Sequence, residues 1–288
     1  MRLGLQVPDF HWPGGNTTLR GDLAAVARTA DDAGFEFLAV MDHFFQIGGV
    51  GPPEDPMLEG YTTLGFLAAQ TSRVNLITLV TGTVYRHPGI LAKQVTTLDV
   101  LSGGRAWLGI GAGWYQAEAE GLGIPFPSTR ERFERLEETL LIARQMFAGD
   151  AEPFEGKHFQ LARPLNSPPP LARPRILIGG TGEQKTLSFV AKYADACNIF
   201  DGPEVERKLD VLRAHCEREG RDFDTLYRTA YLPLRVGADG SGVDELLTRL
   251  RELADMGFQA VLGYVPEVHT LRPLEVIGSE VIPVAEGF

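Results

Sequence analysis

The feature that most constrains the fold is a regular alternation of short apolar segments with longer amphipathic ones. The short segments have the composition of buried strands, and we predict eight of them, at residues 3–7, 37–41, 74–80, 106–110, 175–178, 196–200, 229–236 and 260–265. The longer segments carry apolar residues at helical spacing, at residues 19–33, 62–69, 90–101, 130–147, 187–194, 204–219 and 243–256, with a weakly patterned helix after Val268. Eight strand–helix units without a two-half glycine fingerprint predict a closed (β/α)₈ barrel, the TIM-barrel α/β fold, over a doubly wound sheet.

Residues 149–174 interrupt this alternation. The segment is rich in proline and includes Pro168, Pro169 and Pro170 in succession. Because the alternation resumes beyond it, we interpret it as an excursion from the barrel and not as a linker. We therefore predict a single domain over residues 1–288.

Composition and charge narrow the function classes. Apolar residues make up 44% and charged residues 23% of the chain, which is typical of a globular protein. The net charge of −11 disfavours nucleic acid and anionic membranes as partners, and no apolar run reaches the roughly 18 residues of a membrane span. With no leader pattern and no metal-type spacing of the two cysteines, we expect a cytoplasmic protein that acts on a small molecule.

Polar residues that follow the predicted strands are the candidates for chemistry, because active sites of such barrels lie at the carboxyl ends of the strands. Four groups qualify: Asp9, His11 and Trp12; Asp42 and His43; Thr78, Thr81, Arg86 and His87; and the run Gly111, Ala112, Gly113 and Trp114. Asp42 and His43 are the most informative, because an imidazole beside a carboxylate offers a proton donor near neutral pH and a fixed hydrogen-bond partner. The same pair could equally cap the following helix or satisfy hydrogen-bonding groups of the loop.

Two glycine clusters have two interpretations each. Residues 178–183, Ile-Gly-Gly-Thr-Gly-Glu, lie between a strand and a helix, where bare N–H groups hold phosphate or simply turn the chain. Residues 109–113 either let a flat ring approach the backbone or form a turn. Trp12 and Trp114 either wall an aromatic pocket or pack against loops.

A metal site is an alternative interpretation of some of these residues. Asp9, His11, Asp42 and His43 imitate the ligands of a barrel hydrolase. The fifth and sixth strands end in no histidine and no suitable lysine. We therefore expect no metal.

Several segments, in their order along the chain, resemble the luciferase-like monooxygenase superfamily, and especially its branch that uses the deazaflavin coenzyme F420. They are Leu-Gly-Leu-Gln at 3–6, Met-Asp-His-Phe at 41–44, Thr-Gly-Thr-Val-Tyr-Arg-His-Pro at 81–88, Gly-Gly-Arg at 103–105, Leu-Gly-Ile-Gly-Ala-Gly-Trp at 108–114, Ile-Gly-Gly at 178–180 and Tyr-Ala-Asp at 193–195. The resemblance spans nearly the whole chain. It implies an oxidoreductase that transfers a hydride between a bound deazaflavin and a small organic substrate.

The resemblance also implies roles for individual residues. The third strand carries a bulge with a non-prolyl cis peptide against the central ring, around Thr78, Leu79 and Val80. Asp42 contacts the cofactor, His43 works near the hydride-transfer centre, and the remaining implied contacts are Thr81, Ala112 and Gly113 at the ring and Gly179, Gly180, Gly182 and Glu183 at the phosphate and tail. His11, Trp12 and Trp114 would form the substrate pocket.

The chain departs from the sugar-phosphate dehydrogenases of that branch, which have a catalytic glutamate where Trp114 stands. Their substrate is therefore not carried over, and the tryptophan predicts a more apolar substrate face. His43, with Glu118 or His11, is left as the group that handles the proton.

The compact length and the Tyr-Arg-His-Pro segment at 85–88 favour F420 over FMN. An FMN-dependent monooxygenase and a non-catalytic barrel that binds flavin or deazaflavin are the alternatives. The resemblance further implies a homodimer.

Overall fold

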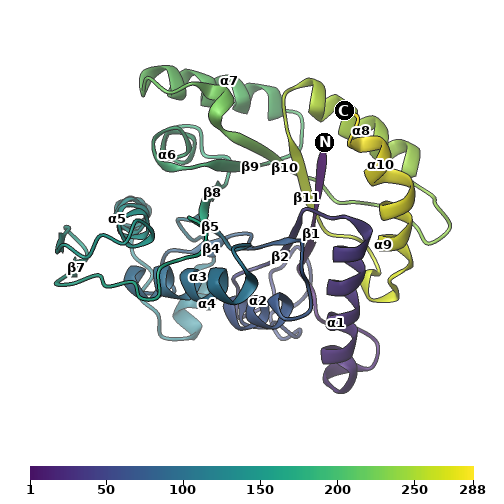
Figure 1. Ribbon diagram of the computed structural model, residues 1–288, viewed down its shortest axis with the longest axis horizontal. Helices are drawn as coiled ribbons and strands as arrows, with labels where there is room; N and C mark the ends of the chain where they lie inside the picture. Colours follow the sequence, from purple (N-terminus) through teal and green to yellow (C-terminus); the bar gives the residue numbers. More distant parts are fainter.

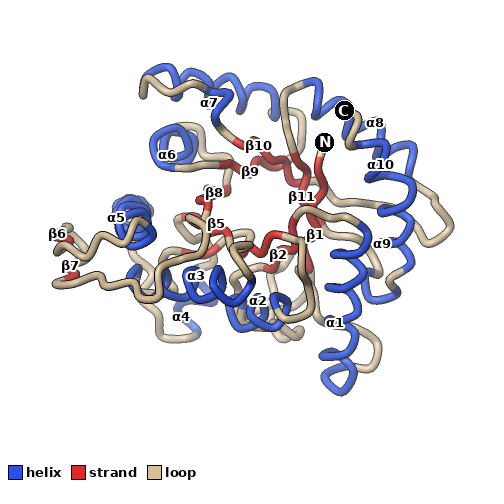
Figure 2. Tube along the Cα trace, in the orientation of Figure 1, coloured by secondary structure: helices blue, strands red, loops and turns tan.

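The strands form a closed ring. In the computed structural model, which describes residues 1–288, the ring strands are β1 (Arg2–Val7), β2 (Phe37–Val40), β3 (Asn75–Thr78), β4 (Thr81–Gly82), β5 (Trp107–Gly111), β8 (Arg175–Gly179), β9 (Ala196–Phe200), β10 (Tyr227–Tyr231) and β11 (Ala260–Gly263). They are parallel in the order β3-β2-β1-β11-β10-β9-β8-β5-β4. A bridge between Leu76 and Ala106 closes the ring. Because β3 and β4 together make the third barrel strand, the predicted barrel of eight strands is confirmed (Figure 2).

Helices surround this ring (Figure 1). They are α1 (Gly15–Ala33), α2 (Gly60–Ala68), α3 (Pro88–Ser102), α4 (Gln116–Gly121), α5 (Thr129–Phe147), α6 (Thr186–Tyr193), α7 (Val205–Arg218), α8 (Val243–Asp255), α9 (Arg272–Val276) and α10 (Ile282–Ala285). Two 3₁₀ turns, Phe223–Thr225 and Val268–Thr270, precede β10 and α9, and a π-helical turn, Ile277–Val281, joins α9 to α10. The short helix α4 was not predicted, and it lies directly after β5, where it can contribute to a site.

A layer of apolar side chains fills the amino-terminal half of the barrel. It consists of Phe37, Ala39, Ile77, Trp107, Leu177, Ala196, Ala260 and Leu262. The rings of Phe37 and Trp107 meet edge to face at 4.9 Å. These residues lie at or near the starts of their strands, so the barrel is closed at the amino end and free space is left at the carboxyl end.

Two predicted strands differ from the structure, and the predicted excursion carries strands of its own. The strand predicted at 229–236 ends at Tyr231, because Pro233 has no N–H to continue the ladder, although Leu234 and Val236 beyond it are buried. The strand predicted at 74–80 is broken between β3 and β4. The predicted excursion carries a short antiparallel pair, β6 (Phe154–Glu155) and β7 (Gln160–Leu161), outside the ring (Figure 1).

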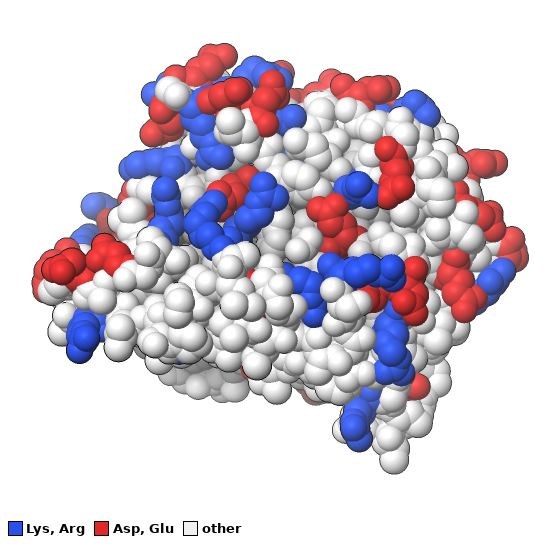
Figure 3. All heavy atoms as spheres, viewed as in Figure 1, with Lys and Arg blue, Asp and Glu red and all other residues white.

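The two ends of the chain meet on the outside of the barrel, where the Met1 ammonium donates to the carbonyl of Ala285 at 2.6 Å. On the face seen in Figure 3, acidic and basic side chains are interspersed, and a broad area over α2 and α3 carries few charges. In α3, the apolar side chains of Ile90 and Leu101 are exposed. None of the helices combines the length and apolar character that crossing a bilayer requires.

Candidate active site

A cavity of about 980 Å³ lies at the carboxyl ends of the barrel strands. Of the residues predicted for the site, twelve line it: His11, Trp12, Asp42, His43, Leu79, Val80, Thr81, Ala112, Gly113, Trp114, Gly179 and Gly180. Thr78, Gly182 and Glu183 are not among its lining residues. Of the other residues predicted to follow the strands, Asp9 and Gly111 also line the cavity, whereas Arg86 and His87 do not. Most of the residues expected to converge from the first five strands therefore share one cavity.

The floor of the cavity includes the peptide between Leu79 and Val80, which is cis, as the resemblance implied. The Gln6 side-chain amide donates to the carbonyl of Leu79 at 3.2 Å. Tyr231 in turn donates its hydroxyl to Gln6 Oε1 at 2.6 Å, and burial raises the pKa of Tyr231 to about 12, so the hydroxyl keeps its proton. Gln6 and Tyr231, which sequence reasoning missed, thus hold this segment from strands β1 and β10.

Two glycines make room for the same segment. A Cβ at Gly109 would lie 2.0 Å from the carbonyl oxygen of Thr78, and one at Gly179 would lie 2.8 Å from Val80 Cγ1. The interpretation that residues 109–113 admit a ring is thus wrong for Gly109, whose missing side chain admits the neighbouring strand. Thr78 does not line the cavity. Its hydroxyl is hydrogen-bonded to Thr81 Oγ1 and to the carbonyl of Gly109.

Asp42 is held by an arginine. Both carboxylate oxygens accept from the Arg86 guanidinium, at 2.7 and 2.8 Å, and the Gly82 N–H donates at 3.2 Å. Burial raises the pKa of Asp42, while Arg86 and the Gly82 N–H act in the opposite direction. Arg86 also binds Glu59, which caps α2. The expected pairing of Asp42 with His43 is therefore wrong, and so is the alternative in which this pair caps the helix.

The partner of His43 is Glu118 on α4. His43 Nδ1 lies 3.1 Å from Glu118 Oε1, and the other carboxylate oxygen accepts from the N–H groups of Phe44 at 2.5 Å and Phe45 at 2.8 Å. Tyr85 donates its hydroxyl to Glu118 Oε1 as well. Burial of Glu118 opposes ionisation, but these hydrogen bonds outweigh it and hold the pKa of Glu118 below its ordinary value. His43 is thus fixed at Nδ1 while its ring lines the cavity.

Aromatic side chains form the walls around His43. Trp114 stacks on Tyr115 with ring centroids 5.0 Å apart and meets the His43 imidazole edge to face at 5.6 Å. Trp12 is buried and packs against His269 at 6.1 Å. Trp114 is 62% exposed, so its face is open to a bound molecule.

His11 lies at the outer part of the cavity. Its side chain is mostly exposed, and Nδ1 lies 3.5 Å from Asp55 Oδ1. No hydrogen bond joins it to His43. Of the two partners considered for His43, the structure brings Glu118 to it and not His11.

The loop after β8 contributes only its first glycines. Glu183 turns outward to α7, where Arg207 and Lys208 donate to its carboxylate at 2.9 and 2.8 Å. Its carbonyl oxygen lies 2.7 Å from His215 Nε2. The expectation that Glu183 faces a bound phosphate is therefore wrong, because two cations on α7 bind its carboxylate.

Arg132 on α5 is a cavity residue that sequence reasoning missed. One of its terminal nitrogens donates to the carbonyl of Pro127 at 2.7 Å, whereas Nε is buried without a partner. Its neighbour Phe133 packs edge to face on Phe189 of α6, so this cation lies on the side of the cavity near the loop after β8. The signal available in the sequence was its place one residue before the apolar face of the predicted helix.

A parallel barrel with an open cavity at the carboxyl ends of its strands, walled by aromatic residues around a fixed imidazole, defines an α/β-barrel enzyme. The sequence model of the luciferase-like monooxygenase family matches residues 1–270. This chain therefore belongs to the luciferase-like monooxygenase family, a family of oxidoreductases.

Two curated relatives and one solved structure are similar to this chain. It is 30% identical over 254 residues, 85% of this chain and 70% of the relative, to an F420-dependent glucose-6-phosphate dehydrogenase of Nakamurella multipartita. It is also 30% identical over 208 residues, 69% of this chain and 56% of the relative, to the pyrimidine monooxygenase RutA of Acinetobacter baylyi. An F420-dependent tetrahydromethanopterin reductase from Methanopyrus kandleri shares the fold, with a TM-score of 0.80 over 98% of both chains at 19% identity.

Proposed function

We propose that this protein is an F420-dependent oxidoreductase that transfers a hydride between the deazaflavin and a small, uncharged organic substrate. The observation that carries the proposal is the His43 imidazole, held at Nδ1 by Glu118, in the same cavity as the cis segment Leu79–Val80. The F420-dependent relative from Nakamurella multipartita supports the choice of cofactor. The matched part covers 70% of that relative's length.

The residues present fit such a cofactor. The cavity volume of about 980 Å³ is at the upper end of the range for small-molecule and cofactor sites. Arg132 has a buried Nε without a partner, and it lies on the side of Gly179, Gly180 and Thr186, whose backbone and hydroxyl suit a phosphate. Leu79 and Val80, with Ala112 and Gly113 after the neighbouring strand β5, would hold the ring.

A deazaflavin, when bound, supplies two-electron hydride transfer and reacts little with oxygen. The residues of this chain would supply orientation and proton transfer. Oxidation of an alcohol to a carbonyl compound releases one proton from the hydroxyl, and His43 Nε2 is the nitrogen free to accept it. In the reverse direction the protonated imidazole would return that proton to the carbonyl oxygen.

The cavity lining favours an uncharged substrate. Arg132 is the one lysine or arginine that lines the cavity, and a cofactor phosphate would occupy it. Asp9 and Glu267 also line the cavity and form no ion pair with a lysine or arginine, so they would repel an anion. Glucose 6-phosphate, which the relative's name specifies, is therefore not proposed as the substrate.

The alternative is an FMN-dependent monooxygenase, which the similarity to RutA supports. Titration of the apo-protein with F420 and, separately, FMN tests the choice, with quenching of cofactor fluorescence as the measurement. We expect micromolar or tighter binding of F420 and at least tenfold weaker binding of FMN.

A preference for FMN, together with oxygen consumption by the reduced complex, would overturn the proposal. Tight F420 binding without substrate-dependent reduction across a panel of alcohols would favour the non-catalytic barrel. The variant Arg132→Gln tests the proposed phosphate contact. It should weaken F420 binding about tenfold, as expected for the loss of a charged contact.

A further inference from the structure

Glu118 is a carboxylate whose four donors come from two different sources. Its side chain is fully buried. Phe44 and Phe45 donate backbone N–H groups to one oxygen, while His43 and Tyr85 contact the other with side chains that line the cavity. A carboxylate needed only to hold a loop would be satisfied by the backbone groups alone.

We propose that Glu118 is the positioning residue of His43, which fixes the imidazole as the tautomer with its proton on Nδ1 and leaves Nε2 free for the substrate. The assignment of Nε2 to the substrate rests on the proposed function. The tautomer follows from the geometry whichever cofactor the cavity binds.

The argument for the tautomer is one of donors and acceptors. A carboxylate surrounded by two N–H groups and a hydroxyl stays ionised and can only accept hydrogen bonds. His43 Nδ1, 3.1 Å from it, must therefore donate. In the neutral imidazole Nε2 then carries no proton and can act as a base.

The residues around the His43 imidazole offer no hydrogen-bond partner at Nδ1 other than Glu118. Trp114 and Tyr115 from the other side meet the imidazole edge to face at 5.6 and 5.8 Å, which restricts rotation about the side chain. Asp42, the nearest carboxylate along the chain, has both oxygens occupied by Arg86. Tyr85 adds a second donor to Glu118 and so keeps Oε1 directed at the histidine.

The test measures the tautomer directly by NMR of protein labelled with ¹⁵N-histidine, without cofactor or substrate. The variant His43→Asn identifies the His43 signals among those of the six histidines. We expect the wild-type protein to show His43 protonated at Nδ1 when the ring is neutral. In Glu118→Gln, whose amide can donate as well as accept, we expect this tautomer to lose its predominance.

The variant Asp31→Asn is the matched control, because Asp31 is a buried carboxylate that also accepts backbone N–H groups but contacts no histidine. The Asp31→Asn variant should leave the NMR signals of His43 unchanged. Glu118→Gln should in addition lower kcat about tenfold or more while cofactor affinity stays within twofold.

Wild-type His43 protonated at Nε2 would overturn the inference even if Glu118→Gln failed to fold. An unchanged tautomer in folded Glu118→Gln would overturn it too. Because the NMR measurement needs no cofactor, failure of F420 to bind would refute the proposed function and leave this inference standing.

Discussion

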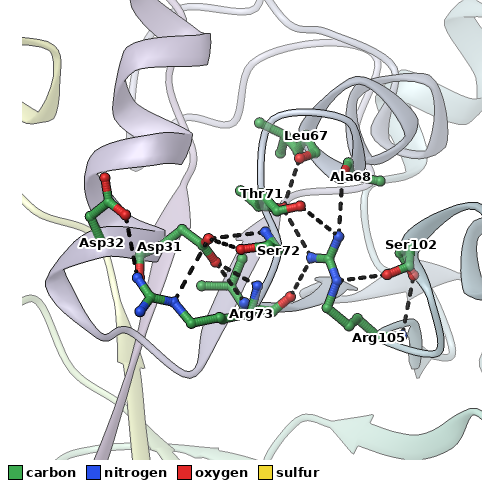
Figure 4. A network of polar contacts seen from close by, with 10 residues as sticks. Asp31, Asp32, Leu67, Ala68, Thr71, Ser72, Arg73, Ser102 and Arg105 are labelled. Atoms are coloured by element: carbon green, nitrogen blue, oxygen red, sulfur yellow. Dashed lines mark hydrogen bonds and ion pairs between the residues drawn. The ribbon is translucent and has the colours of Figure 1, made fainter.

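At each end of the barrel a buried carboxylate accepts backbone N–H groups, but the two carboxylates differ in their other partners. At the amino end, Asp31 of α1 accepts the N–H groups of Ser72, Arg73 and Val74 at 2.8–2.9 Å, just before β3 (Figure 4). At the carboxyl end, Glu118 accepts two N–H groups just after β2. Both carboxylates are buried. Only the second also contacts an imidazole that lines a cavity.

Asp31 and, nearby, Arg105 bind mainly backbone groups at the amino end, and these partners have no protonation state that could change. Arg105 donates to the carbonyls of Ala68, Thr71, Val74 and Ser102 at 2.7–3.1 Å, so that it ties α2, the loop before β3 and the end of α3 together (Figure 4). Backbone groups neither gain nor lose protons. The comparison therefore predicts that changes at the amino end alter stability, and that changes at the carboxyl end alter turnover.

The largest expected effect is at His43. The variant His43→Asn keeps a donor for Glu118 but removes the base, so kcat should fall roughly 10²- to 10⁴-fold, while F420 affinity and the urea midpoint of unfolding change little. Steady-state kinetics with a reactive alcohol, fluorescence titration and urea unfolding measure the three quantities. A large loss of stability with unchanged kcat would reverse the comparison.

The second effect is at Asp31. In Asp31→Asn the amide nitrogen faces N–H donors, which leaves a buried donor unsatisfied and should cost about 2–3 kcal/mol of the free energy of unfolding. Turnover at a temperature where the variant is folded should stay within twofold of the wild type. A tenfold fall in kcat of the folded variant would show that the two ends are coupled.

The pH dependence of the free energy of unfolding tests the stabilising role of Asp31 further. Burial raises the pKa of Asp31, but the N–H groups of Val74, Ser72 and Arg73 outweigh it, so the folded-state pKa lies below the ordinary value of about 4. The ionised side chain therefore stabilises the fold above that pH, and this stability is lost as the pH falls through the folded-state pKa. The stability difference between wild type and Asp31→Asn should shrink between pH 5 and roughly pH 3. Urea unfolding across that range measures it, and a constant difference would contradict the assignment.

The smallest expected effect is at Trp114. Its side chain is mostly exposed and stacked on Tyr115, so Trp114→Ala should reduce the free energy of unfolding by about 1 kcal/mol or less. It should raise KM for an apolar substrate several-fold and leave F420 affinity unchanged. Trp107→Phe, in the closed amino half of the barrel, is the contrasting variant, expected to lower stability without changing KM. Equal KM for Trp114→Ala and wild type would remove Trp114 from the substrate wall.

Much of the framework could be predicted because it depends on local patterns. The alternation of apolar segments with helical periodicity indicated eight strands and hence a barrel, and a barrel brings polar residues after its strands to one mouth. Leu79, Val80, His43 and Trp114 were expected in one site on these grounds and by resemblance, and they line one cavity. The strand end at Tyr231 was missed because apolar residues continue beyond it to Val236, and α4 was missed because it is only six residues long.

What the sequence by itself determined, then, is the barrel and many of the residues at its mouth, because periodicity and strand order are properties of neighbouring residues. Which side chains pair was decided only by the tertiary structure. Successive residues at a strand end point in different directions, so Asp42 binds Arg86 while His43 binds Glu118, 75 residues away. Likewise Gly109 is required by the carbonyl of Thr78, and Glu183 is directed outward by cations on α7. Such pairings depend on distances between segments that meet only when the ring closes.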